Sequence, residues 1–407
     1  MNEPTPPAPR VRRLRVRLAC AHAAIVAFLA LWIVVPAPLA PLYPLAVGAV
    51  EVGHWLALAA LIALVVAAPR SPARRTRLAA LALAAAALVL AMTPLARFPD
   101  AARAADAAFA AGFGDAWRSR LTPAAATALT PRRYALADAL TGIDLPGIAP
   151  RERTYIGGDG QPLGVDIYVP TTPGPHAVVA HFHSGGWSGG TRRLHAALDR
   201  WLAGRDFVVM AFSYRLAPAH RYPAAVDDAR AALAWARAHA GEHGGDGARL
   251  VAIGHSAGAQ LAMLAGYEPG SGARAVATFY GPIDLDQGWR VPPRPDPLDV
   301  RHIIETYIGG TPAELPVPYR EGSPISRVAP GLPPTLIIQG GRDHVVLVGR
   351  TREMAAALRA AGSPAALIEI PWAEHAFDAV FDGPSNQLAL YHLDRFLAWA
   401  LADEPPR

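Results

Sequence analysis

Long apolar runs fill most of the first hundred residues of the chain. Residues 18–35, 45–68 and 78–95 are almost entirely apolar. A helix that crosses a bilayer needs about 20 mostly apolar residues, with about 17 to 25 tolerated. All three runs meet this requirement, so the pattern predicts a membrane anchor over residues 18–95 with about three transmembrane helices.

Two of these runs allow other interpretations. Residues 18–35 could be a cleaved signal peptide, although two further runs follow them. Residues 78–95 are rich in alanine, which is only weakly apolar, and could form a soluble helix. The second run contains Glu51 and His54, three positions apart and therefore on one helix face. No third polar group extends this pair into a pathway, which favours a polar pair satisfied between helices or near the interface.

The arginines around the runs predict an orientation. Residues 1–17, which are rich in proline and arginine and expected to be disordered, contain five arginines. The connection 69–77 contains four, whereas the proline-rich connection 36–44 contains none. Positively charged segments stay in the cytoplasm. We therefore expect an integral, multi-pass membrane protein whose chain beyond about residue 96 is extracytoplasmic, and one span fewer would reverse that side.

Residues 96–150 form a predicted linker with an amphipathic helix. Phe109, Phe113 and Trp117 recur every four residues, which places them on one helix face. We expect this stripe to pack on the following domain or on the membrane surface rather than to bind a cofactor.

From residue 151 the pattern changes to short apolar strands that alternate with helices. Such alternation after an opening hairpin predicts an α/β fold, a mostly parallel sheet with helices on both faces, over residues 151–407. The proline-rich residues 286–333 interrupt it and predict a small cap, to which residues 101–118 could contribute. Strands are expected at 153–156, 163–169, 177–183, 207–214, 250–253, 275–280, 335–339 and 366–370, and helices at 194–203, 224–240, 350–361 and 387–402.

Residues 249–265 hold the strongest local motif. An apolar strand, residues 250–253, runs into Gly-His-Ser-Ala-Gly at 254–258, and an alanine-rich helical segment follows. A strand, a tight G-x-S-x-G turn and a helix form the nucleophile elbow of serine hydrolases. The glycines let strand and helix approach each other, and the turn exposes the hydroxyl of Ser256 at the edge of the sheet.

A nucleophilic serine needs a base, and the base needs an acid that orients it. Asp343 follows the strand 335–339, and His375 follows the strand 366–370. The carboxyl ends of parallel strands meet at one edge of a sheet, and the order serine, acid, histidine is the one expected of this architecture. The sequence therefore predicts a triad of Ser256, Asp343 and His375.

The strand 177–183 ends in a glycine-rich loop, His-Ser-Gly-Gly-Trp at 183–187. We expect the amides of Gly185, Gly186 and Ala257 to form an oxyanion hole. Ser188 lies in a second G-x-S-x-G match, but no apolar helix follows it, so it is rejected as the nucleophile. The aromatic side chains beside these positions are equally consistent with a substrate pocket or with the core: they are Trp187, Tyr280 and Phe377.

Composition and charge exclude several classes of function and of site. Residues 1–96 contain nine of the 38 basic and two of the 33 acidic residues, so the rest of the chain carries a net charge of −2 and does not favour nucleic-acid binding. The single cysteine, Cys20, excludes an intramolecular disulfide and a cysteine-rich metal site. His181 and His183 lack further ligands at metal-binding spacing, so we expect no metal. A mean hydropathy of +0.20 agrees with a membrane-embedded part.

Residues 151–402 resemble the α/β-hydrolase fold, and within it the hormone-sensitive-lipase-like and acetyl-esterase-like carboxylesterases. The segments that carry the resemblance are HSGGW (183–187), SYRLAP (213–218), the helix at 222–240, GHSAG (254–258), FYGPIDL (279–285), GRDHVV (341–346) and EHAF (374–377). The resemblance implies ester hydrolysis through an acyl-enzyme without a cofactor, with the triad and oxyanion donors named above. The chain departs from the usual H-G-G-G at Ser184, which is not one of the expected donors.

These observations predict a membrane-anchored serine hydrolase for short-to-medium acyl esters, with a small-molecule or lipid ester as substrate. A peptidase or amidase of the same fold uses the same mechanism and stays open. The non-enzymatic alternative is a membrane interaction protein without catalytic activity. The complete triad argues against this alternative. The sequence leaves the oligomeric state undetermined.

Overall fold

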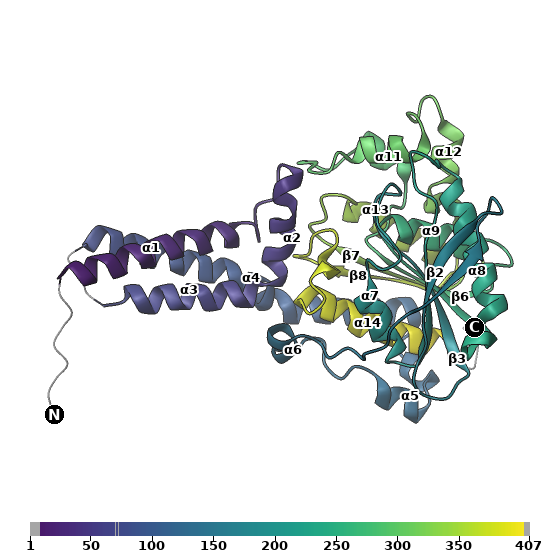
Figure 1. The fold of residues 1–407 in the computed structure, drawn as a ribbon, viewed down its shortest axis with the longest axis horizontal. Helices are drawn as coiled ribbons and strands as arrows, with labels where there is room; N and C mark the ends of the chain where they lie inside the picture. The colour runs from purple at the N-terminus through teal and green to yellow at the C-terminus, as the bar shows by residue number, and fades with distance from the viewer. Residues whose placement is uncertain (1–8, 70, 72, 403–407) are drawn as a thin grey trace.

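The computed structural model describes residues 9–69, 71 and 73–402. The described residues before 99 form a helical stalk, which is joined to an α/β unit (Figure 1). The α/β unit is built on an eight-stranded sheet of order β1-β2-β4-β3-β5-β6-β7-β8. The first two strands form the expected antiparallel hairpin, β2 pairs antiparallel with β4, and the remaining neighbours are parallel. The strands are β1 (Arg151–Ile156), β2 (Pro162–Tyr168), β3 (His176–Phe182), β4 (Phe207–Phe212), β5 (Gly245–His255), β6 (Ala273–Phe279), β7 (Thr335–Gly340) and β8 (Ala365–Ile370).

Helices cover both faces of this sheet, which confirms the predicted fold class. One face packs on α7 (Ala196–Ala203), α14 (Pro384–Ala400) and the end of α4 (Arg74–Phe113). The other face packs on α8 (Ala224–His239), α9 (Ala257–Gly266) and α13 (Val348–Ala360). The central strands are buried on both sides and consist almost wholly of apolar residues, as parallel strands in such a layer require.

The predicted cap region lies between β6 and β7. It contains three short helices, α10 (Leu285–Arg290), α11 (Val300–Ile308) and α12 (Pro316–Glu321). Residues 101–118, which could have contributed to it, pack elsewhere. Phe109, Phe113 and Trp117 are buried, and the ring of Phe113 packs at a tilt against Phe396 and Trp399 of α14. The aromatic stripe thus packs on the sheet layer, on the side away from α9.

The stalk corrects the expectation of three continuous spans. Among the residues that the structure describes, two helices are long and apolar enough to cross a bilayer, α1 (Pro9–Leu31) and α4. The second predicted span is broken at Val52 into α2 (Tyr43–Glu51) and α3 (Gly53–Ala67), a pair bent by 81°. The third span and the amphipathic linker helix form a single helix, because α4 continues for 40 residues through Pro94 and Pro99.

Two further expectations for the N-terminal part change. Residues 9–17 are the first turns of α1 and are not disordered, while residues 1–8 lie outside the described part. Glu51 and His54 do not share a helix face, since the bend separates them. Each instead bonds to the part of the chain beyond the stalk: Glu51 accepts from the amide of Ser385, and His54 contacts the carbonyl of Ala139.

The side chains of the stalk are arranged as in a bundle that faces lipid. Its interior consists of alanine layers, one of Ala19, Ala67 and Ala80, and the next of Ala23, Ala63 and Ala84. Large apolar side chains point outward instead, which is typical of close-packed membrane helices and unfavourable in water. These exposed side chains include Leu14, Leu18, Ile25, Phe28, Leu58, Leu61, Ile62, Val65, Leu78 and Val89.

Candidate active site

Ser256 occupies a strained turn between β5 and α9. Its backbone has φ 50° and ψ −118°, a conformation that few non-glycine residues adopt. Glycines on both sides make this turn possible: a Cβ at Gly254 would overlap the backbone of Gly258, and a Cβ at Gly258 would overlap the carbonyl of Phe182. The turn therefore holds the hydroxyl at the carboxyl end of β5, at the amino terminus of α9.

The structure brings Ser256, Asp343 and His375 together. The Ser256 Oγ lies 2.8 Å from the Nε2 of His375, and the Nδ1 of His375 lies 2.8 Å from the Oδ2 of Asp343. The same Oδ2 accepts from the side-chain amide of Gln339 at 2.7 Å. All three side chains are largely buried. The distances and order suit a serine whose proton passes to a histidine oriented by a carboxylate.

The Asp343 carboxylate is also fixed from its other side. Its Oδ1 accepts from the backbone amides of Val345 and Val346, both at 2.7 Å. A carboxylate bonded in this way cannot rotate freely, and it stabilises a positive charge on the neighbouring imidazole. Sequence reasoning missed Gln339, the polar residue near the end of an otherwise apolar strand, whose amide completes this arrangement.

The loop after β3 holds the predicted oxyanion glycines in backbone conformations that other residues rarely adopt. Gly185 has φ 133° and Gly186 has φ 56°, conformations that favour glycine. A Cβ at Gly185 would overlap the carbonyl of Gly189. Both glycines and Ala257, the first residue of α9, line the same cleft as Ser256 and His375.

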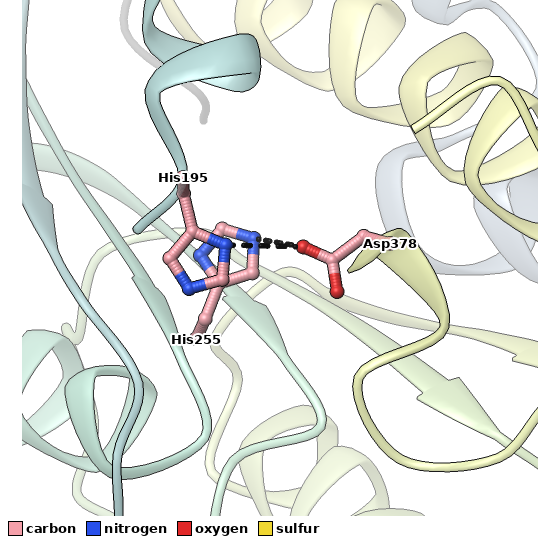
Figure 2. Close-up of side chains that lie close together, drawn as sticks. All are labelled: His195, His255 and Asp378. Atoms are coloured by element: carbon pink, nitrogen blue, oxygen red, sulfur yellow. Dashed lines mark ion pairs between the residues drawn. The ribbon is translucent and has the colours of Figure 1, made fainter. Parts of the chain in front are cut away.

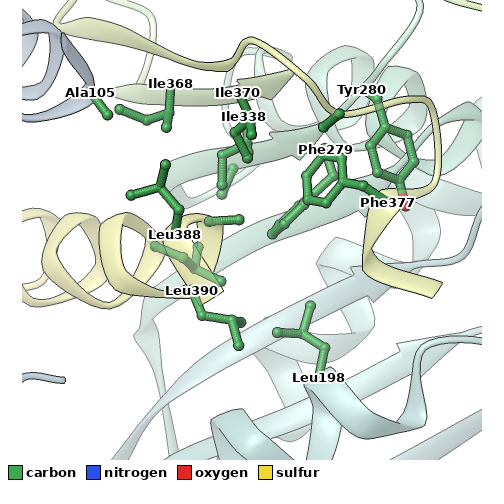
Figure 3. Close-up of a cluster of buried hydrophobic side chains, with 14 of the residues drawn as sticks. Ala105, Leu198, Phe279, Tyr280, Ile338, Ile368, Ile370, Phe377, Leu388 and Leu390 are labelled. Carbon is green, nitrogen blue, oxygen red and sulfur yellow. The ribbon is translucent and has the colours of Figure 1, made fainter. Parts of the chain in front are cut away.

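This cleft has a volume of about 280 Å³ and is lined mainly by apolar side chains of the cap region and of the loop after Asp343. Trp187 and Tyr280, two of the three aromatic candidates, line it. Phe377 does not. It is fully buried in the core, where it packs edge-on against Tyr280 and near Phe279 (Figure 3). The apolar cleft residues are Ile283, Leu285, Val291, Leu298, Val300, Ile303, Ile304, Val345, Val346 and Leu347.

Next to Ser256 lies a cluster of His195, His255 and Asp378 that the sequence did not predict (Figure 2). The Oδ2 of Asp378 lies 3.3 Å from the Nδ1 of His195 and 3.2 Å from the Nε2 of His255. The Oδ1 of Asp378 accepts from the hydroxyl of Tyr280. Burial lowers the pKa of His255 to about 3, so this ring stays neutral beside the nucleophile.

The ring geometry of this cluster argues against a shared metal ion. The three ligand atoms lie within 4.8 Å of one another. However, the rings of His195 and His255 are stacked 4.0 Å apart with their planes 16° from parallel, and Phe279 stacks on the other side of His255. A metal must lie in the plane of each imidazole, and the planes of stacked rings do not meet at one ion. The geometry instead fits one carboxylate that lies within ion-pair distance of both imidazoles.

The histidines of the rejected metal pair have separate roles. His181 bonds to Asp199 at 2.5 Å and to the ring of His255 at 3.0 Å, so it extends the buried cluster. His183 donates from Nδ1 to the carbonyl of Ser184 and stacks on the ring of Tyr214. The one sequence signal for the cluster was the histidine before the serine in Gly-His-Ser-Ala-Gly.

Known proteins share this arrangement of strands and elbow. The esterase of Pyrobaculum calidifontis, in its monoclinic form, matches 63% of this chain and 86% of its own with a TM-score of 0.56 and 23% identity. That likeness and the elbow geometry decide the fold. The chain has the α/β-hydrolase fold. The BD-FAE family model matches residues 165–358 of the chain.

Sequence relatives of the chain include esterases. Esterase LipC of Mycobacterium tuberculosis is 32% identical over 268 residues, which covers 61% of this chain and 64% of LipC. Carboxylesterase NlhH of the same species is 40% identical over 123 residues, covering 30% of this chain and 38% of NlhH. The chain thus spans less than two thirds of the length of these curated relatives.

Proposed function

We propose that the protein is a membrane-anchored serine hydrolase that cleaves carboxylic esters. The hydrogen bonds from Ser256 to His375 and from His375 to Asp343, at a strained elbow, carry this proposal. In the proposed reaction, the Oγ of Ser256 attacks the ester carbonyl carbon while Nε2 of His375 takes its proton. His375 then protonates the departing alcohol, and water releases the acyl group by the same route. Asp343 stays ionised throughout and stabilises the imidazolium.

The proposed oxyanion donors are the backbone amides of Gly185, Gly186 and Ala257. Their residues line the cleft on the side of Ser256, and the amino terminus of α9 adds a favourable dipole. Loss of one such donor typically costs about 3 to 4 kcal/mol of transition-state stabilisation. All groups that this reaction needs are present in the polypeptide, so the proposal includes no cofactor.

The cleft supports an ester with a short-to-medium acyl chain. Its volume of about 280 Å³ lies at the lower end of the range for small-molecule sites, and its lining is mainly apolar. Such a cleft favours an aliphatic acyl group of a small-molecule or lipid ester. A peptidase or amidase remains the alternative enzyme, because the same groups cleave both bonds.

Replacement of the nucleophile tests the activity. We expect Ser256→Ala in the full chain, purified in detergent, to lower kcat for p-nitrophenyl acetate and butyrate by at least about 10⁴-fold, as removal of such a serine does in related triads. Ser188→Ala is the matched control, since Ser188 lies in the same cleft and the competing motif, and should retain activity. A fluorophosphonate should label the wild type at Ser256. Ester turnover that survives Ser256→Ala would refute the mechanism, and a folded wild type that neither reacts nor turns over esters would support the silent interaction protein.

A further inference from the structure

The catalytic aspartate and histidine lie on two loops that meet the stalk. Residues 341–347 follow β7 and carry Asp343, while residues 371–383 follow β8 and carry His375. The second loop ends where α14 begins. Segments of the stalk that are about 300 residues away in the sequence bond to the first loop and to the first turn of α14, directly after the second loop.

Glu51, the last residue of α2, fixes the end of the histidine loop. Its side chain is fully buried, and its Oε2 accepts from the backbone amide of Ser385 at 3.0 Å, in the first turn of α14. A side-chain oxygen at this place satisfies a free amide at the amino terminus of the helix. Gly383 is part of the same contact, because a Cβ there would overlap the Glu51 carboxylate.

The aspartate loop is held by a second contact. Arg342, next to Asp343, donates to the backbone carbonyl of Ile33 in the segment after α1. The guanidinium also lies 3.9 Å from Glu374, the neighbour of His375. Glu374 is fully buried and accepts from the ring and the amide of His344. Arg342 therefore joins the stalk to both loops at the positions next to the two catalytic side chains.

Two aromatic side chains of the stalk complete the contact. Tyr43, the first residue of α2, is buried in the same apolar cluster as Trp372 and Ala373 of the histidine loop. Phe98 of α4 packs on Trp372 with ring centroids 5.8 Å apart. Trp372 in turn donates from Nε1 to the hydroxyl of Ser385 at 3.0 Å, beside the amide that Glu51 accepts. The histidine loop is thus packed between the stalk and α14.

We infer that Glu51 and Arg342 are positioning residues, through which the membrane anchor holds His375 and Asp343 in register with Ser256. This inference rests on the proposed function. A displacement of about 1 Å at a catalytic group can cost about 100-fold in rate. The anchor then does more than tether the enzyme, since hydrolysis requires α2 to be docked on the loops.

The test is Glu51→Ala in the full chain in nanodiscs, with kcat expressed per site titrated by a fluorophosphonate. We expect kcat per titrated site to fall at least tenfold while KM changes less than twofold, because the cleft itself is untouched. Glu51→Gln keeps the volume and an acceptor for the Ser385 amide, and should restore kcat to within about threefold. His54→Ala is the matched control, since it removes a polar stalk side chain that contacts Ala139 rather than the catalytic loops.

A merely structural role would lower the number of titratable sites and leave kcat per site unchanged, which would overturn the inference. If Glu51→Ala does not fold, Arg342→Met decides the question, because it keeps the aliphatic stem and removes the donor to Ile33. We expect the same fall in kcat per site for this variant. Wild-type turnover separates the two proposals: an inactive wild type refutes the proposed function, whereas active wild type with fully active variants refutes only the positioning role.

Discussion

Ser184 replaces the first glycine of the usual H-G-G-G loop, and the backbone explains why a side chain is tolerated there. Positive φ angles occur at the next three residues, Gly185, Gly186 and Trp187, but not at Ser184 itself. Its hydroxyl lies 3.0 Å from the Nε2 of His195, a member of the buried cluster next to Ser256. The serine therefore ties the oxyanion loop to that cluster without straining the loop.

Ser184→Gly and Gly185→Ala should consequently differ strongly in activity. Ser184→Gly removes one neutral hydrogen bond, typically worth about 0.5 to 1.5 kcal/mol, so kcat/KM should stay within about tenfold of the wild type. Gly185→Ala forces a side chain into φ 133° and against the carbonyl of Gly189, and should lower kcat/KM by at least about 100-fold. Steady-state kinetics on p-nitrophenyl butyrate would measure both. Equal losses would mean that the amides of this loop do not serve the oxyanion.

The sequence located the catalytic candidates because each one follows an apolar strand. Ser256, Asp343 and His375 stand at strand ends, and parallel strands bring such ends to one edge. Phe377 was ambiguous because a core aromatic and a pocket aromatic look alike in sequence, and the structure buries it. Glu51 stood out only as a polar residue in an apolar run, and Arg342 gave no usable signal, since the partners of both are distant segments whose proximity depends on how the stalk docks.

At the level of elements, strands and helices of the α/β unit were predictable to within a few residues, apart from the start of β5. That strand begins at Gly245 rather than at residue 250, because its first residues are polar and its register shifts at Leu250. The broken second span was not predictable from hydropathy. Hydropathy measures how apolar a segment is and contains no information about the direction of the helix axis. Helices α2 and α3 are both apolar and lie on either side of an 81° bend.

Substitution by alanine should have opposite effects on stability at two glycines near this bend. Gly53 begins α3 in close contact with α4, and a Cβ there would lie 2.8 Å from the carbonyl of Ala91. We expect Gly53→Ala to destabilise the stalk by about 1 to 3 kcal/mol through overpacking. Gly48 in α2 has open space around its Cα, so Gly48→Ala should be neutral or stabilise the helix by up to about 1 kcal/mol. Thermal unfolding in nanodiscs would compare them, and a neutral Gly53→Ala would contradict the close packing of α3 on α4.

At the scale of the whole molecule, positively charged side chains and exposed apolar side chains occupy different parts of the stalk. The arginine-rich starts of α1 and α4 lie together at the end remote from the α/β unit (Figure 1). Arg77 binds the carbonyls at the end of α3 at the same place. Between this basic end and the α/β unit the stalk exposes large apolar side chains over alanine layers. This order of a basic end, an apolar bundle and a nearly neutral domain is typical of a protein that crosses a membrane with its basic end inside.

The side of the membrane on which the α/β unit lies depends on whether α2 and α3 together cross the bilayer. The packing of α3 favours a full crossing by this pair. Ala67, at the end of α3, packs in one layer with Ala19 near the start of α1 and Ala80 near the start of α4. Helix α3 therefore returns to the basic end of the stalk rather than turning back half-way. Its 15 residues rise about 22 Å, less than the about 30 Å of a bilayer core, and the arginines that follow it can extend to the headgroups.

Reporter fusions after residues 71 and 402 test this topology. We expect a cytoplasmic reporter, such as a fluorescent protein that folds only there, to be active after residue 71. Alkaline phosphatase, which needs the oxidising outer compartment, should be active after residue 402. The reverse result would mean that α2 and α3 form a re-entrant segment and that the α/β unit faces the cytoplasm. The two arrangements place each fusion site in opposite compartments, so either outcome is unambiguous. The outcome also shows from which compartment the ester must reach Ser256.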